Sequence, residues 1–190
     1  GRVRTLAGAY TETPVEMAVD GVGSAARFSQ PMGVAISDDD RTVFVADTGF
    51  HCIRAVDVST GETRTLAGSG VPGAEDTNRQ HHNPGQFHAP RGLGLAPGGR
   101  ALIVADTSNN AIRRVEIALC HWGAQCSIQT LAGNGSPGLQ NGVAPAAMFS
   151  RPTAVASTLS ADGRPYALVA DEGNAAVRII HFVDRALEWY

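Results

Sequence analysis

Short apolar runs, each broken by turn residues, make up most of the chain. Between residues 32 and 68 they read "MGVAIS", "TVFVAD", "CIRAVDV" and "TRTLAG", with turn residues such as "DDD", "TGF" and "STG" between them. Runs of this length that are rich in Val, Ile and Thr are typical of strands, and helical periodicity is absent. This part of the chain therefore predicts four antiparallel strands joined by tight turns, at 32–37, 42–47, 52–58 and 63–68.

The same order of landmarks occurs three times. The stretches "ADTGFHCIR" (46–54), "ADTSNNAIR" (105–113) and "ADEGNAAVR" (170–178) are near copies of one another. A "Phe-x-x-Pro" motif precedes each of them, at 28–31, 87–90 and 149–152. Self-similarity at a fixed period indicates that one supersecondary unit is repeated. We predict an all-β fold, a β-propeller in which each unit is a four-stranded antiparallel blade.

The landmarks also set the predicted boundaries of the units. Blade one spans 28–68, blade two spans 87–132 and blade three spans 149–190, where the last strand is the least defined. The "TLAG" that ends the outer strand in blades one and two recurs at 5–8. Residues 1–8 are therefore predicted to be an outer strand that lacks the other strands of its blade. Completing the third blade, as propellers close, is the alternative place for this strand.

The pattern TLAG…F…P.G(V/L)A…VADT.N..IR resembles the NHL repeat, and it covers nearly the whole chain. The resemblance implies a propeller that in most members has six blades. Propellers close with about four to eight blades, so three blades leave two open apolar sides. We therefore expect residues 1–190 to be part of a larger, six-bladed propeller. The open sides call for further blades of the same chain or assembly, or for protein partners.

One face of the predicted propeller carries most of the irregular sequence. Because strands of a meander alternate in direction, the "AD" turns and the blade-to-blade loops emerge on the same face, which we call the loop face. Its loops are 9–27, 69–86 and 134–148, longer than the roughly 2–5 residues usual in hairpins. Long loops on a rigid scaffold are a common place for binding.

Two sets of charged residues recur once per blade. A ring of carboxylates suits Ca²⁺, which prefers oxygen ligands, but an Asp at the same place in each turn is also what a structural turn requires. These aspartates are Asp47, Asp106 and Asp171. The recurring arginines suit an anionic ligand, or a carboxylate or carbonyl of a neighbouring blade. They are Arg54, Arg113 and Arg178. We interpret both sets as structural.

The histidines are less regular, and they form the candidate metal site. His81, His82 and His88 lie in the loop before blade two, and His51 lies on a turn of the same face. Imidazoles from several blades suit Zn²⁺. The family resembled includes a zinc-dependent lyase for hydroxyglycine peptide ends, which uses histidines on such a face. Solvated loop histidines are the alternative, and they are the one we favour because no spacing here is diagnostic of a metal.

Three further positions bear on the compartment. Cys120 and Cys126 flank "HWGAQ" between two strand ends, a separation that suits a disulfide and favours an oxidising compartment. Free thiols in a reducing cytosol are the alternative. Asn134 begins an "NGS" glycosylation sequon on the loop face, although Pro137 follows directly after it. These features favour an extracellular or cell-surface protein, with the cytoplasm as the other reading.

The composition of the chain argues against several classes of function. The chain has 15 Lys and Arg residues against 18 Asp and Glu, for a net charge of −3, and every cation is an Arg. The arginines form no basic patch, which argues against nucleic acid as a partner. No apolar run reaches the roughly 18 residues of a membrane span.

The residues favour a non-catalytic protein-interaction or structural scaffold, a segment of a larger protein, with no cofactor expected. A metal-dependent propeller enzyme, lyase-like or lactonase-like with bound Zn²⁺ or Ca²⁺, is the alternative hypothesis. An RNA-binding propeller is the least favoured.

Overall fold

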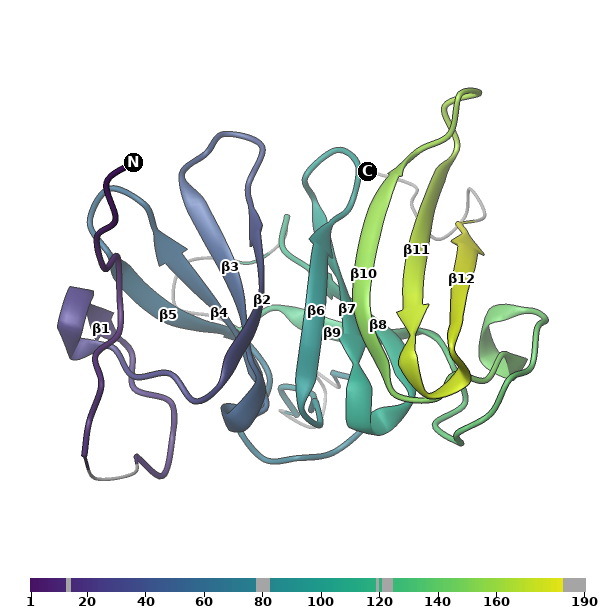
Figure 1. The fold of residues 1–190 in the computed structure, drawn as a ribbon, viewed down its shortest axis with the longest axis horizontal. Helices are drawn as coiled ribbons and strands as arrows, with labels where there is room; N and C mark the ends of the chain where they lie inside the picture. Colours follow the sequence, from purple (N-terminus) through teal and green to yellow (C-terminus); the bar gives the residue numbers. More distant parts are fainter. Residues whose placement is uncertain (13–14, 78–82, 119, 121–124, 183–190) are drawn as a thin grey trace.

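Three antiparallel sheets stand side by side along the chain (Figure 1). The computed structural model describes residues 1–12, 15–77, 83–118, 120 and 125–182. The first sheet has the strand order β1-β5-β4-β3-β2. Its strands are β1 (Gly21–Val22), β2 (Pro31–Ile36), β3 (Thr42–Asp47), β4 (Cys52–Asp57) and β5 (Glu62–Ala67).

The second and third sheets repeat this arrangement, in the orders β6-β7-β8-β9 and β10-β11-β12. The second contains β6 (Pro90–Leu95), β7 (Ala101–Asp106), β8 (Ala111–Glu116) and β9 (Ser127–Ala132). The third contains β10 (Pro152–Leu159), β11 (Pro165–Asp171) and β12 (Ala176–His181). The all-β class is confirmed, and we keep the names blade one, two and three. The predicted last strand of blade three falls at 183–190, outside the described residues.

The helices of the described residues are single 3-10 turns. They are η1 (Gly23–Ala25), η2 (Thr48–Phe50), η4 (Thr107–Asn109), η5 (Ala144–Ala146) and η6 (Glu172–Asn174). Three of them form the "AD" turns, each ended by a left-handed residue at His51, Asn110 or Ala175. None of the helices in the described part of the chain has the length and apolarity to cross a membrane.

Residues 1–8 do not form the predicted outer strand. A strand requires a hydrogen-bonded neighbour, and no strand of the described residues runs beside them. Only the end of the segment is anchored, where the Gly8 N–H donates to the Gly23 carbonyl at 3.0 Å. The sequence of an outer strand is present, but no strand in the described part of the chain lies beside it to pair with.

The apolar core lies between the blades, in two clusters. Phe44 and Ile53 of blade one pack with Leu102 of blade two, while Ile103 on the other face of β7 packs with Val169 of blade three. All of β7 is buried, because blade two has a neighbour on each side. Burial of this kind supplies the main favourable free energy of folding.

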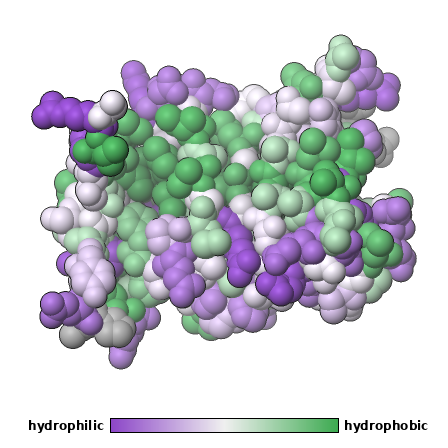
Figure 2. Space-filling model, in the orientation of Figure 1, coloured by the Kyte–Doolittle hydropathy of each residue, from purple (hydrophilic) through white to green (hydrophobic). Residues whose placement is uncertain are grey.

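The outer sides of blades one and three have no such cover among the described residues. Val34 on β2 is 68% exposed and Val177 on β12 is 77% exposed, and each lies among other exposed apolar side chains of its blade. Figure 2 shows a band of apolar surface across the middle of the molecule, with polar side chains above and below it. Contiguous exposed apolar surface is a mark of an interaction site.

Glycines allow the innermost strands to approach closely. A Cβ added at Gly33 would lie 2.3 Å from the Arg91 carbonyl oxygen, and one at Gly92 would lie 2.5 Å from the Ala154 Cα. A side chain at either position would therefore push neighbouring blades apart. Blade three has Ala154 at the matching position, where it is exposed.

The loop face is arranged as the strand directions predict. Asn109 in η4 donates to the Gly73 carbonyl at 2.7 Å, and Asn174 in η6 donates to the Gly138 carbonyl at 2.8 Å. Two of the three "AD" turns are thus bonded to the long loops that pass beside them, at the lower end of the view in Figure 1. The rigid sheets fix the start and end of each loop.

Candidate functional site

Each blade holds a buried ion pair at the edge of the loop face. The Arg54 Nη1 lies 2.9 Å from the Asp47 Oδ2, and the Arg113 Nη1 lies 2.7 Å from the Asp106 Oδ2. The third pair, Arg178 with Asp171, has the same contact at 2.8 Å. All three carboxylates are fully buried. Their other oxygens, Oδ1, accept backbone N–H groups at 2.7–2.8 Å, donated by Ser29, His88 and Ser150.

The second half of each guanidinium is held by the loop that enters the blade. The Arg54 Nη2 donates to the Asp20 Oδ1 at 2.7 Å, and the Arg113 Nη2 donates to the Asp76 Oδ1 at 2.7 Å. In blade three an amide, Asn141, takes this place, and its Oδ1 accepts from the Arg178 Nη2 at 2.8 Å. Each guanidinium also lies over a ring, at 4.9–5.7 Å from the centroids of Phe28, Phe87 and Phe149. These contacts leave the guanidinium groups engaged on several sides.

The partners of the arginines differ from those predicted. A carboxylate or carbonyl of a neighbouring blade was expected, whereas Arg54 bonds a carboxylate of its own blade and, on the entering loop, a carboxylate and two carbonyls. Register explains the first partner: Arg54 lies opposite Val45 on β3, and Asp47 is two positions along on the same face. The second partners were missed because they stand at uneven distances before the recurring Phe.

Burial raises the pKa of Asp47, although the Ser29 N–H and Arg54 act against it. Burial likewise raises the pKa of Asp106, opposed first by the charge of Arg113. Each carboxylate would therefore be costly to bury without its arginine. Both oxygens of these groups already accept N–H donors, and a cation would have to displace them. Each of the three aspartates is therefore engaged by hydrogen-bond donors of its own blade and entering loop.

The histidines come together in part. The rings of His51 and His88 lie edge to face with centroids 5.6 Å apart. The His51 Nδ1 accepts the Ala89 N–H at 3.0 Å, just as the Asn110 Oδ1 accepts the Arg151 N–H at 2.9 Å one blade further on. His51 therefore links blade one to blade two. Burial, with a further contribution from the charge of His88, lowers the pKa of His51.

The metal hypothesis is not tested by these positions. His81 and His82 lie outside the described residues. Within the described ranges, no group of three or more His, Cys, Asp or Glu side chains is placed to hold a metal ion. A zinc or calcium site therefore stays a prediction.

The cysteines follow the prediction. Cys120 and Cys126 form a disulfide with a Cα–Cα distance of 5.2 Å, in the connection from β8 to β9. Cys52 is free and buried, and burial raises the pKa of its thiol to about 12. Asn134 is exposed, and its Oδ1 accepts the Ser136 N–H at 2.9 Å, while its glycosylation stays a prediction.

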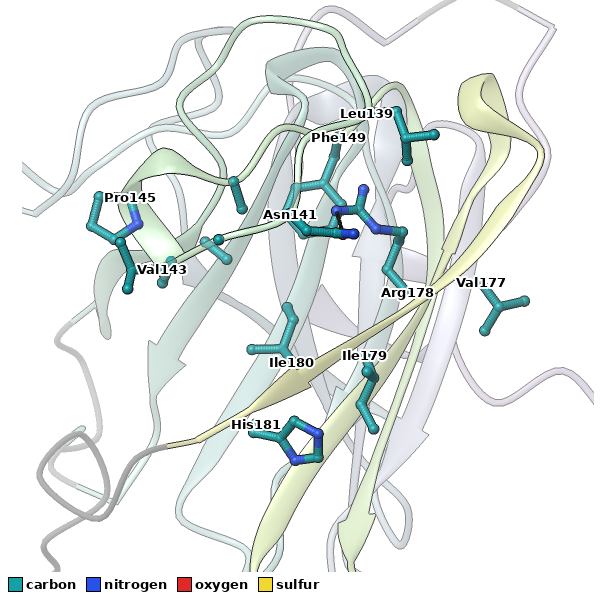
Figure 3. Close-up of a pocket in the computed structure, with 14 residues that line it drawn as sticks. Leu139, Asn141, Val143, Pro145, Phe149, Val177, Arg178, Ile179, Ile180 and His181 are labelled. Carbon is teal, nitrogen blue, oxygen red and sulfur yellow. Dashed lines mark hydrogen bonds between the residues drawn. The ribbon is translucent and has the colours of Figure 1, made fainter.

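A groove runs along the outer edge of β12, which no strand of the described residues occupies. Its volume is about 870 Å³, and it lies between β12 and the loop before blade three. Figure 3 shows Asn141 and Arg178 together at one part of the groove, with Ile180 and His181 further along β12. In blades one and two, β5 and β9 fill the matching space.

Sheets set side by side, with inner strands in close approach and an ion pair repeated in each, define a β-propeller. Solved structures agree. Two auxiliary nutrient binding proteins, from Bacteroides thetaiotaomicron and Bacteroides ovatus, superpose with TM-scores of 0.63 and 0.64 at 18% identity. The matches cover 78% and 85% of this chain, and 36% and 40% of those chains.

The family follows from curated relatives. Protein SUPPRESSOR OF QUENCHING 1, chloroplastic, of Arabidopsis thaliana is 30% identical over 158 residues, 80% of this chain. NHL repeat-containing protein 2 of Bos taurus and Homo sapiens is 36% identical over 52% of it. The chain belongs to the NHL-repeat β-propeller family. It spans 13–14% of the length of these relatives. No protein-family model matches the chain.

Proposed function

We propose that this propeller segment is a non-catalytic scaffold that binds protein partners, as part of a larger protein. The proposal rests on the contacts that the repeated polar residues make. Each Asp and Arg that recurs in the blades is bonded within its own blade and entering loop. Since a fold does not by itself define a function, the surface that varies between blades is where a function is to be sought.

The loops of the loop face have the character of a protein-binding surface. Each long loop carries at least one large apolar side chain in solvent, among them Tyr10 (90% exposed), Met17, Val71 and Leu139. Aromatic residues and Met are enriched at protein interfaces. Net charge and the absence of a basic patch favour a protein over a nucleic acid.

Loop substitutions test this proposal. The triple variant Tyr10→Ser, Met17→Ser, Val71→Ser removes apolar surface from two loops and leaves the sheets intact. We expect a partner purified with the native protein to bind the variant at least about tenfold more weakly. Arg164→Ser, on an exposed hairpin at the opposite end, is the matched control. Equal affinity of the partner for the triple variant and the control would contradict the proposal.

We also propose an oxidising compartment, extracellular or at the cell surface. The Cys120–Cys126 disulfide supports this, because such bridges are rare in reducing cytosol. Non-reducing mass mapping of protein isolated from its native source is the measurement. A linked peptide pair is the expected result, while free thiols at both positions would favour the cytoplasm.

A metal-dependent propeller enzyme is the second candidate, and the His51–His88 pair is the observation that favours it. It is weaker, because the Nδ1 of His51 is already engaged by the Ala89 N–H. Metal analysis separates the two functions. Stoichiometric Zn²⁺ that is lost in His51→Ala plus His88→Ala would favour the enzyme, whereas metal-free protein with intact partner binding supports the scaffold.

A further inference from the structure

The loop that enters each blade places one polar side chain against the blade arginine. In blades one and two this residue is an aspartate, and Asp20 and Asp76 each accept from the arginine Nη2 at 2.7 Å. In blade three it is Asn141, whose Oδ1 accepts from the Arg178 Nη2 at 2.8 Å. The carbonyl of the preceding residue accepts from the same Nη2 at 2.9–3.2 Å in every blade, at Val19, Glu75 and Gln140. An amide thus stands in a site that is otherwise built for a carboxylate.

The residue after Asn141 is a glycine, and an Asn-Gly sequence is chemically labile. Without a side chain on the second residue, its backbone nitrogen can approach the Asn Cγ closely. A Cβ added at Gly142 would meet no atom within 4 Å, whereas one at Gly21 in blade one would lie 3.1 Å from the Ala25 Cβ. The Gly142 N–H also donates to no backbone acceptor in the described part of the chain. The backbone nitrogen beside Asn141 is therefore neither crowded nor held elsewhere.

Arg178 acts on the other side of the same amide. Its guanidinium donates to the Asn141 Oδ1, the atom on which negative charge develops when a nucleophile attacks Cγ. A fixed donor at that oxygen stabilises the tetrahedral intermediate, as the donors of an oxyanion hole do. Arg178 is itself fixed, by Asp171 at 2.8 Å and by the Phe149 ring at 4.9 Å. Figure 3 shows Asn141 and Arg178 together at one part of the groove.

Water reaches this position in all three blades. Asn141 and Gly142 are exposed. The side chains of Asp20 and Asp76 are 52% and 47% exposed, although β5 and β9 lie along their blades and donate a threonine hydroxyl to each of them. A strand along β12 would therefore leave Asn141 open to water, and the argument does not depend on what lies beside that edge.

We propose that Asn141 is a deamidation site, and that its aspartate product gives Arg178 the second carboxylate that the arginines of blades one and two already have. The Gly142 nitrogen loses its proton and bonds to the Asn141 Cγ. The Cγ–Nδ2 bond breaks, and Nδ2 leaves with that proton as ammonia, which produces a cyclic imide. Water then adds to Cγ, the bond from Cγ to the Gly142 nitrogen breaks, and the nitrogen regains a proton. The sum is an amide plus water giving a carboxylic acid plus ammonia.

The position of Arg178 also selects between the two ways of opening the imide. Addition of water at Cγ gives aspartate, whereas addition at the backbone carbonyl gives isoaspartate. Because the guanidinium lies on the oxygen of Cγ, it polarises that carbonyl and favours aspartate. The new carboxylate then stays beside the cation.

The chain supplies an internal control for the reaction. Asn134 is followed by Gly135 and is also exposed, but its Oδ1 accepts the Ser136 N–H at 2.9 Å and no guanidinium is bonded to it among the described residues. In the unfolded chain the two Asn-Gly pairs have the same local chemistry. A difference between them that exists only in the folded protein therefore reports on the contact with Arg178.

Peptide mapping by mass spectrometry measures both asparagines at once. The intact protein, produced without N-glycosylation, is aged at mildly alkaline pH in the folded state and in urea. We expect the ratio of the rate at Asn141 to the rate at Asn134 to be at least about threefold higher in the folded state. Aspartate should be the main product at Asn141. Equal ratios in the two states, an Asn141 that keeps its amide while Asn134 reacts, or isoaspartate as the main product would overturn the inference.

Two variants test the product. Asn141→Asp builds it directly and is expected to raise the Tm of the freshly prepared protein by up to about 2–4 °C, since the new ion pair is partly exposed. Native protein should approach this Tm as it ages, while Asn141→Gln, which keeps an amide, should not change. An Asn141→Asp protein no more stable than fresh native protein would overturn the pairing with Arg178. None of these results alters the loop-face proposal, because partner binding there is measured separately.

Discussion

Removing one arginine from a buried ion pair tests most sharply how much these pairs contribute to the stability of the blades. Arg113→Met keeps most of the length of the side chain and deletes its charge. The Asp106 carboxylate is fully buried and would lose its counter-ion, as well as the hydrogen bond at 2.7 Å. Asp76 is half exposed, so its share of the network is small. Stranding a buried charge costs about 3–5 kcal/mol.

Urea denaturation followed by far-ultraviolet circular dichroism measures this loss, with the thermal midpoint as a second readout. For a chain of this size, about 3–5 kcal/mol corresponds to roughly 6–20 °C in Tm. Adding Asp106→Asn removes the stranded charge, and we expect it to recover part of the stability. Arg164→Met is the control, since its pair with Asp162 is mostly exposed and contributes about 0–1 kcal/mol.

Two results would refute this reasoning. A loss below about 1 kcal/mol for Arg113→Met would mean that the pair is no more valuable than a surface contact. An equal loss in the single and double variants would mean that the stranded carboxylate is not the cause.

Three further predictions concern single residues. Cys52, with a thiol pKa of about 12, should resist alkylation at pH 8 in the folded chain and react at once in denaturant; rapid labelling under native conditions would contradict its burial. Hydrogen bonds from Ser59 and Thr60 lower the pKa of Asp57 to about 2, below its unfolded value near 3.9. Its contribution is therefore present above about pH 4 and lost as pH falls through 2, so Asp57→Asn should flatten the acid limb of a urea-midpoint series from pH 7 to 2. Parallel curves for Asp57→Asn and the native chain would exclude this contribution of Asp57. Gly92→Ala should cost about 1–3 kcal/mol in urea unfolding, because its Cβ would meet backbone atoms of blade three at 2.5 Å; an unchanged midpoint would show that the sheets separate at little cost.

The strands were predictable because strand propensity is a local property of the residues in each apolar run. "TVFVAD" has turn residues on both sides, and the structure places β3 at Thr42–Asp47 as predicted. The "AD" turns were equally regular in the sequence, and in the structure a residue in the left-handed conformation ends each one. Three copies in register were the basis for the predicted boundaries of the blades.

The polar network was only half visible in the sequence. Asp47 and Arg54 recur at a constant spacing of seven residues, which marks them as a pair. Asp20 and Asp76 precede the recurring Phe by 8 and 11 residues, and the blade-three counterpart is an amide. Because loop length varies freely on a fixed scaffold, no periodic signal pointed to these partners.

Residues 1–8 show the opposite failure. Their sequence is that of an outer strand, yet strand formation depends on a partner edge that a local pattern does not contain. The groove beside β12 was not visible in the sequence for the same reason, since it exists only because the described part of blade three has no outer strand like those of blades one and two.

Hydrogen exchange along β12 tests most directly whether the open edge is completed by another strand. Amides of β12 that do not bond to β11 point into the groove. We expect them to be protected in the larger protein proposed above to the level of their counterparts in β8, which pairs with β9, and to exchange faster in the isolated segment of residues 1–190. Rapid exchange at these amides in the larger protein, with β8 still protected, would contradict the account.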